Sequence, residues 1–263
     1  MQDLNVTLLQ SDLHWHQPEA NRAMFEEQIW SLKQATDLII LPEMFTTGFT
    51  MEASELAEPM GTRTFKWLQQ QAEQTKAAIT GSYIVKENGK YFNRLLWVTP
   101  DGNHVSYDKR HLFRLGKEDL TYQKGTERLI VSWKGWNVFP QICYDLRFPV
   151  WSRNTSTDKS LEFDLMIFVA NWPTPRISAW DVLLQARAIE NSCYTIGVNR
   201  IGKDPNGHEY SGHSAVVDPK GKVICYEEGK EAVQSITLVR AEMDQFRDKF
   251  SFYLDADNFN IQG

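Results

Sequence analysis

The chain has 263 residues, 42% of them hydrophobic and 24% charged, so it can bury a sizeable core and its composition excludes a disordered protein. Its 28 basic and 34 acidic residues give a formal net charge of −6. Sequence-independent binding to nucleic acid or to anionic lipid requires a basic surface, so we expect neither nucleic acid nor a membrane as a partner. The length suits one large α/β unit, and we predict a single domain over residues 1–263.

The first half of the chain alternates between strand and helix patterns. In chain order these predict a strand over 4–10, a helix over 21–35, a buried strand over 38–41, a helix over 62–77, and strands over 78–86, 91–99 and 105–109. The Asn88-Gly89 pair is typical of a tight hairpin turn. The two strands that flank this pair are therefore predicted to form a β-hairpin.

The second half continues the alternation and ends in a meander. In chain order the patterns predict strands over 129–132, 136–142 and 165–170, a helix over 179–191, and strands over 194–199, 215–218, 223–226 and 233–238. Helices that flank many strands favour sheets covered by helices on their outer faces. The predicted fold class is a layered α/β sandwich.

The chain carries no sequence signal for a membrane or for an oxidising compartment. Its apolar runs, such as 166–170, are far shorter than the roughly 20 residues of a membrane-spanning helix. The first residues show no basic region before an apolar core, so we expect a cytoplasmic protein. Cys143, Cys193 and Cys225 are too few and too scattered for a disulfide framework or a zinc knuckle. Any important cysteine is expected to be a free thiol.

Three reactive side chains come directly after strands, where a scaffold can hold them rigidly. Glu43 follows the apolar strand 38–41 and Pro42, while Lys109 ends an alternating strand. Taken singly, a charged residue at a strand end is usually a solvated loop residue, and a cysteine in an apolar stretch is usually an inert core residue. At Cys143, however, the strand 136–142 runs straight into a predicted helix.

The surroundings of Cys143 favour a reactive thiol. The passage from strand to helix resembles a nucleophile elbow, in which the next backbone N–H can face a developing oxyanion. The neighbouring Asp145 and Arg147 also weaken the interpretation as a core residue. Because Cys193 and Cys225 lack such surroundings, we interpret both as structural.

Taken together, these segments resemble the nitrilase superfamily, which has a Glu–Lys–Cys triad in this order. The matching motifs are Leu41-Pro42-Glu43 and the segments 107–113, 143–149, 170–173 and 187–191. The resemblance implies a four-layer αββα sandwich of the nitrilase type, commonly in a homodimer, and a catalytic triad of Glu43, Lys109 and Cys143. A second family glutamate, expected between the lysine and the cysteine, fits Glu118, with Asp119 and Glu127 as nearby alternatives.

The chemistry of such a triad follows from its side chains. A thiol attacks an amide as thiolate, so Cys143 needs a base and a cation nearby, and Glu43 and Lys109 could supply them. Lys109 and the Tyr144 backbone N–H would bind the oxyanion, and Glu118 would orient Lys109 through hydrogen bonds. A Cys143 thioester would then be hydrolysed by water that Glu43 activates. These steps require no metal and no cofactor.

Within the superfamily, the sequence resembles the ω-amidase branch, which removes ammonia from the terminal amide of short dicarboxylate monoamides such as 2-oxoglutaramate. Such an enzyme must hold the free carboxylate of its substrate. Arg147 and Arg176 are the candidate anchors, and Arg147 could equally be a structural ion-pair partner. Aromatic residues that flank the reactive positions or the Asn171 loop are expected to line the pocket: Phe45, Phe49, Tyr144 and Trp172.

Several alternatives remain open from the sequence. His111 and His213 are candidate bases in a Cys–His arrangement with Cys143, and His14-Trp15-His16 has the spacing of some metal pairs without a third ligand. Another carbon–nitrogen hydrolase (carbamoylase, aliphatic amidase or nitrilase) differs only in its pocket, and a non-catalytic binding protein could share the fold. The aromatic segment 246–259 is the candidate dimer contact, or it packs on its own subunit.

Overall fold

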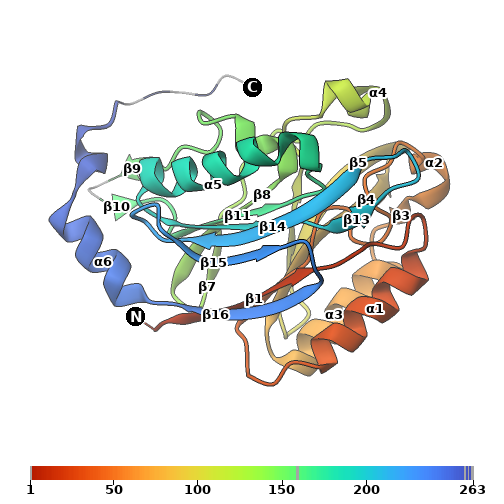
Figure 1. The fold of residues 1–263 in the computed structure, drawn as a ribbon, viewed down its shortest axis with the longest axis horizontal. Helices are drawn as coiled ribbons and strands as arrows, with labels where there is room; N and C mark the ends of the chain where they lie inside the picture. Colours follow the sequence, from red (N-terminus) through yellow and green to blue (C-terminus); the bar gives the residue numbers. More distant parts are fainter. Residues whose placement is uncertain (1, 158–159, 258, 260, 262–263) are drawn as a thin grey trace.

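The computed structural model describes residues 2–157, 160–257, 259 and 261, and its framework is a pair of mixed β-sheets (Figure 1). The first sheet has the strand order β16-β1-β2-β4-β5-β6, and β3 pairs with β4. Its strands are β1 (Leu4–Gln10), β2 (Leu38–Ile40), β3 (Glu58–Pro59), β4 (Ala78–Glu87), β5 (Lys90–Val98), β6 (His104–Asp108) and β16 (Ala232–Leu238). The last strand of the chain thus pairs antiparallel with the first.

The second sheet has the order β13-β14-β12-β11-β8-β7, and β15 pairs with β14. Its strands are β7 (Val131–Trp133), β8 (Trp136–Ile142), β11 (Leu165–Val169), β12 (Tyr194–Val198), β13 (Ile201–Lys203), β14 (Glu209–Val217) and β15 (Val223–Glu228). A separate small hairpin pairs β9 (Ser156–Thr157) with β10 (Ser160–Leu161). In the middle of the sheet β8, β11 and β12 are parallel, so the carboxyl ends of these strands meet at one edge.

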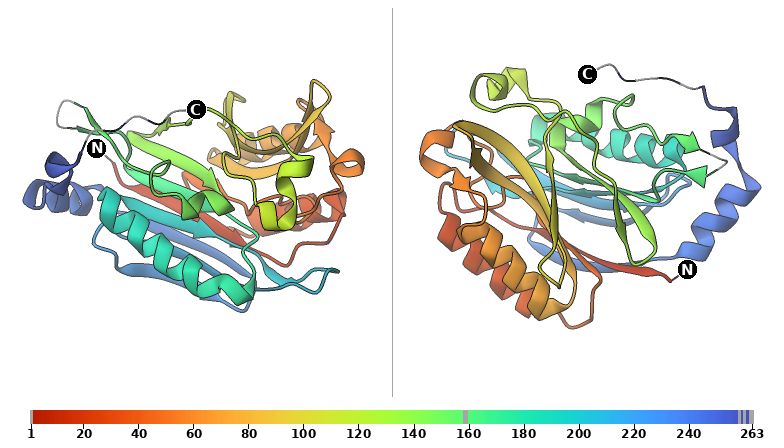
Figure 2. Two further views of the ribbon diagram at one scale, coloured as in Figure 1. Left: turned by 90° about the horizontal axis from the view of Figure 1, so that it is seen from above. Right: turned by 180° about the vertical axis from the view of Figure 1, so that it is seen from behind.

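Helices cover the outer faces of both sheets. In Figures 1 and 2, α1 (Pro18–Trp30) and α3 (Arg63–Thr75) lie side by side against the first sheet, while α5 (Ile177–Asn191) lies against the second. The shorter helices are α2 (Ala53–Leu56), α4 (Glu118–Thr121), η1 (Arg114–Gly116), η2 (Cys143–Arg147), η3 (Thr174–Arg176) and η4 (Phe252–Asp255). The final helix, α6 (Arg240–Lys249), runs along the edge of the molecule. The predicted αββα layers are confirmed.

Strand β2 shows why the layers assemble in this way. Leu38 and Ile40 point into the core between the two sheets, whereas Ile39 packs in the core beneath α1 and α3. All three side chains are fully buried, which is the pattern expected of a strand covered on both faces. A strand placed between two apolar layers holds the loop that follows it rigidly, and in β2 that loop carries Glu43.

The structure corrects the bounds of two predicted elements and adds a helix that was not predicted. The helix predicted over 21–35 is α1, which begins at the Pro18-Glu19 pair that marks a helix start in the sequence, but it ends at Trp30 and not at Ala35. The strand predicted over 215–218 is the end of the longer β14, which begins at Glu209. Helix α6 was not predicted because only Met243 of its residues is buried, which leaves no apolar periodicity. No helix in the described part of the chain is long and apolar enough to cross a membrane.

Candidate active site

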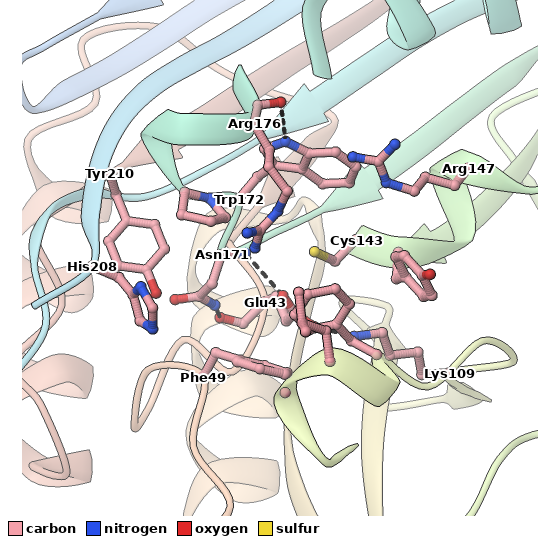
Figure 3. A pocket seen from close by; sticks show the side chains of 15 residues that line it. Glu43, Phe49, Lys109, Cys143, Arg147, Asn171, Trp172, Arg176, His208 and Tyr210 are labelled. Carbon is pink, nitrogen blue, oxygen red and sulfur yellow. Dashed lines mark hydrogen bonds and ion pairs between the residues drawn. The ribbon is translucent and has the colours of Figure 1, made fainter. Parts of the chain in front are cut away.

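The structure brings Glu43, Lys109 and Cys143 together at one pocket (Figure 3), and Glu118 joins this cluster through Lys109. Lys109 Nζ donates to Glu43 Oε1 at 2.8 Å and to both carboxylate oxygens of Glu118 at 3.0 Å. These three side chains are at most 1% exposed. Glu43 comes from the loop after β2, Lys109 from the end of β6, Glu118 from α4, and Cys143 from the start of η2. Four separate segments of the chain therefore converge on one site.

Cys143 has the backbone of an elbow. Its φ is +44°, a left-handed conformation that non-glycine residues adopt only when the surroundings impose it. The fully buried Asp145 carboxylate accepts hydrogen bonds from the Ile142 N–H at 3.1 Å, the His111 N–H at 2.9 Å and the Tyr107 hydroxyl at 2.8 Å. Asp145 thus ties the elbow to β8 and to the segment after Lys109, which holds the sulfur in place.

Two asparagines hold Glu43. The Asn93 side-chain amide donates to Glu43 Oε1 at 2.8 Å, and the Asn171 backbone N–H donates to Oε2 at 2.8 Å. The Asn171 side-chain amide also donates to the Glu43 carbonyl at 2.5 Å. Asn171 lies in a predicted motif, but sequence reasoning missed Asn93. The available signal was a buried polar residue in strand β5 next to the apolar run 95–98.

The charges in the cluster shift the ionisation of its members. Burial lowers the pKa of Lys109, but the charges of Glu118, Glu43 and Cys143 raise it by more than burial lowers it. The pKa of Lys109 therefore lies above its ordinary value, and the ammonium form persists. Burial, followed by the Glu43 carboxylate, raises the pKa of Cys143 well above its ordinary value, although Lys109 lowers it. Burial also raises the pKa of Glu118, and Lys109 only partly offsets this. A raised pKa favours the neutral thiol, so attack on an amide requires a base that accepts its proton.

A cavity of about 160 Å³ opens beside Cys143. It is smaller than the roughly 300–1,000 Å³ of sites for drug-sized ligands, so it suits a small molecule. Its lining includes all five predicted substrate-binding residues, namely Phe49, Tyr144, Arg147, Trp172 and Arg176. His208 and Tyr210 also line it and were not predicted, because they come from the β13–β14 hairpin, distant in sequence from every motif.

The prediction that Phe45 lies near the pocket is wrong. Phe45 is fully buried in the core beneath α1 and α3, where its ring lies 5.8 Å from the rings of Phe25 and of Trp67. Met44, between Glu43 and Phe45, has a φ of +42°, so the chain turns sharply directly after Glu43. The carboxylate is therefore directed to the site and the phenyl ring to the core.

Both candidate arginines border the cavity. The Arg147 guanidinium lies over the Trp172 ring at 4.9 Å, as Figure 3 shows, and the Arg176 guanidinium lies over the Phe113 ring at 5.1 Å. Within the described residues, neither guanidinium has a carboxylate partner. The alternative that Arg147 is a structural ion-pair partner thus gains no support, and the nearby Asp145 is engaged by backbone N–H groups, His111 and Tyr107.

The structure also bears on the alternative bases for Cys143. His111 Nδ1 bonds to Asp145 Oδ1 at 2.8 Å, and its ring stacks on Phe148 at 3.7 Å. His213 Nδ1 lies 2.9 Å from Asp181 Oδ2 on α5. In the described part of the chain neither imidazole forms a hydrogen bond with Cys143, so the Cys–His arrangement gains no support. Cys193 is fully buried in the core and Cys225 packs against it, as expected of structural cysteines.

Replacing Asp145 with alanine is expected to lower the free energy of unfolding by about 2–4 kcal/mol, because it leaves two backbone N–H groups and a hydroxyl without their acceptor. Urea titration followed by circular dichroism measures this change. Asp181→Ala is the matched control, since its carboxylate also bonds a histidine but is 35% exposed, and a loss below about 1 kcal/mol is expected. Equal losses in the two variants would show that Asp145 does not hold the elbow.

Comparison with known proteins agrees with this geometry. The chain belongs to the carbon-nitrogen hydrolase family, whose model matches residues 5–248. This confirms the resemblance to the nitrilase superfamily and makes the protein a C–N hydrolase.

Three relatives show how far the similarity extends. The chain is 44% identical to the ω-amidase YafV of Escherichia coli over 264 residues, covering 99% of this chain and all of that protein. It is 34% identical to the 2-oxoglutaramate amidase of Bacillus subtilis, covering 91% and 90% of the two chains. A CN-hydrolase superfamily protein of Xanthomonas campestris, crystallised with an arsenic adduct in its active site, superimposes with a TM-score of 0.97 at 47% identity and full coverage of both chains.

Proposed function

We propose that the protein is an ω-amidase that hydrolyses the terminal amide of short dicarboxylate monoamides, such as 2-oxoglutaramate, to the acid and ammonia. The observation that carries this proposal is the small cavity that joins Cys143 and its acid–base cluster to two arginines without carboxylate partners among the described residues. Such a cavity can present an amide to the sulfur at one end and hold an anion at the other. The names of the similar amidases support the same reaction.

Acylation begins with the neutral thiol of Cys143. As sulfur bonds to the amide carbon, the carbonyl π pair moves to oxygen and the thiol proton passes to Glu43. Lys109 and the Tyr144 backbone N–H stabilise the resulting oxyanion. The oxyanion then collapses, the C–N bond breaks, and Glu43 gives its proton to the departing nitrogen. Ammonia leaves and a thioester remains on Cys143.

Deacylation reuses the same groups. Glu43, again ionised, takes a proton from a water molecule while the oxygen of that water bonds to the thioester carbon. When the new oxyanion collapses, the C–S bond breaks and the sulfur recovers the proton, so the enzyme returns to its starting state. Glu118 holds the Lys109 ammonium through two hydrogen bonds of 3.0 Å, which keeps the cation directed at the oxyanion in both halves of the reaction.

The far end of the substrate provides the test of the proposed function. If an arginine binds its carboxylate, removing that carboxylate leaves a buried charge unpaired and costs on the order of 2–5 kcal/mol in transition-state binding. We expect kcat/KM for 2-oxoglutaramate or succinamate to exceed that for butyramide by at least roughly 30-fold. The preference should disappear in one of Arg147→Ala and Arg176→Ala, which identifies the anchor.

Other substrate classes are distinct outcomes of the same assay. Equal kcat/KM values for the acidic and neutral amides would contradict the ω-amidase proposal and favour an aliphatic amidase. Faster ammonia release from N-carbamoyl amino acids or from nitriles would favour a carbamoylase or a nitrilase. Location in the cytoplasm and a single domain over residues 1–263 stay predictions from the sequence.

We also propose that the protein is a homodimer. Support comes from the C-terminal segment, where Phe252 is 60% and Leu254 is 52% exposed, and from α5, where Val182 is 64% exposed. Exposed apolar side chains of this size are typical of association surfaces. Light scattering at micromolar concentration is expected to give twice the chain mass of 30.5 kDa, and Phe252→Asp should shift the population toward monomer. A wild-type protein that scatters only as monomer would refute the dimer.

A further inference from the structure

Asn93 lies at the centre of the acidic cluster, although no predicted motif includes it. It is on β5 and fully buried, and its Nδ2 donates to Glu43 Oε1 at 2.8 Å and to Glu118 Oε1 at 3.2 Å. Lys109 Nζ donates to the same two oxygens at 2.8 and 3.0 Å. Two donors therefore bridge two carboxylate oxygens in a closed ring of four hydrogen bonds.

The neighbours of Asn93 fix the orientation of its amide. Turning the amide over would place Oδ1 against two carboxylate oxygens, and acceptors repel one another. In the present orientation Oδ1 is buried and has no hydrogen-bond partner among the described residues. A buried unpaired acceptor costs free energy, and the two hydrogen bonds that Nδ2 donates are the contacts that can offset this cost.

The lone pairs of Glu43 can be assigned one by one. A carboxylate has about four lone-pair sites, two on each oxygen. Oε1 accepts from Lys109 and Asn93, and Oε2 accepts from the Asn171 backbone N–H. One site on Oε2 is left over.

We propose that Asn93 is a positioning residue: together with Lys109 it saturates Oε1 of Glu43, so that the proton of the Cys143 thiol passes to Oε2. The proton leaves sulfur as the S–C bond forms and returns from Oε2 to the departing nitrogen. This inference rests on the proposed function, in which Glu43 is the base for Cys143.

Replacing Asn93 is also expected to change the pH dependence of turnover. A hydrogen bond donated to a carboxylate favours its ionised form, so losing the bond favours the protonated form. The charged and titratable groups that face Glu43 are Lys109, Glu118 and Cys143, with Tyr122 and Tyr210 also interacting with its charge. All of them remain when Asn93 is replaced. The acidic limb of kcat/KM should therefore move to higher pH.

The experiment compares pH profiles of kcat and kcat/KM for Asn93→Ala and Asn93→Leu. Leucine fills the volume of the amide without a donor, which keeps β5 packed if the cavity left by alanine destabilises the fold. In both variants we expect kcat to fall about 10–100-fold, KM to change less than about threefold, and the acidic limb to rise by about one pH unit.

Asn191→Ala is the matched control. Asn191 is a buried asparagine of α5 that bonds Asn154 and Ser152 outside the cluster, so its loss should reduce stability without moving the acidic limb. An unmoved limb in a folded Asn93 variant, or an equal movement in Asn191→Ala, would overturn the role of Asn93. Normal hydrolysis by Cys143→Ala would instead overturn the proposed function, so the two failures are distinguishable.

Discussion

Replacing Cys143 with alanine is expected to lower kcat/KM at least about 1,000-fold while the protein stays folded. The sulfur is the atom that bonds to the substrate, and no other group at the site can replace it as a nucleophile of similar reactivity. Folding should be nearly unaffected, because Cys143 lies half-buried at a turn and a small side chain there leaves the Asp145 hydrogen bonds in place.

Initial rates of ammonia release over a range of amide concentrations measure the loss in kcat/KM, and thermal unfolding reports on the fold. Cys225→Ala is the matched control, since Cys225 is also half-buried but lies on β15, away from the cavity. It should retain activity. Normal hydrolysis by a folded Cys143→Ala variant would show that the nucleophile has been assigned to the wrong residue.

Glu43→Gln and Lys109→Met are expected to lower kcat about 100- to 10,000-fold with little change in KM. Both groups act on the transition state: one moves a proton and the other stabilises the oxyanion, whereas the ground-state amide needs neither. In Glu43→Gln burial still raises the pKa of Cys143, and the carboxylate that accepts the thiol proton is gone. Iodoacetamide should therefore alkylate Cys143 more slowly in Glu43→Gln than in the wild type.

The Lys109 variant carries a second expected effect. Removing the ammonium leaves Glu43 and Glu118 buried without their shared cation, which should lower the free energy of unfolding by about 3–5 kcal/mol. Lys124→Met, at an exposed position, should change neither stability nor turnover. Wild-type turnover in Glu43→Gln or in Lys109→Met would remove that residue from the mechanism.

The main features of the site could be predicted because each reactive residue follows a buried strand in a recognisable motif. Glu43, Lys109 and Cys143 are separated by more than 30 residues from one another, yet strand order and family resemblance were enough to group them. Glu118 was predicted from the family pattern alone. Its contact with Lys109 depends on the left-handed turn at Lys117, which the sequence does not reveal.

Other features depend on packing that only the fold supplies. Asn93 is a buried polar residue of β5, and its side-chain partners are Glu43 in the loop after β2 and Glu118 of α4. His208 and Tyr210 reach the cavity only because the β13–β14 hairpin extends from the second sheet. The position of Phe45 was mispredicted because nearness to Glu43 in sequence does not determine which side of a sharp turn a ring occupies.

Mass spectrometry of a covalent intermediate tests the proposed reaction most directly. Glu43→Gln is mixed with 2-oxoglutaramate, quenched in acid and measured intact. This variant is chosen because thioester hydrolysis is slowed in it, so that any acyl-enzyme that forms persists long enough to be detected. The account predicts a mass increase equal to the substrate less ammonia, located by peptide mapping on Cys143 and missing from the Glu43→Gln/Cys143→Ala double variant. An adduct on Cys193 or Cys225, or full hydrolysis by the double variant, would contradict a thioester mechanism at Cys143.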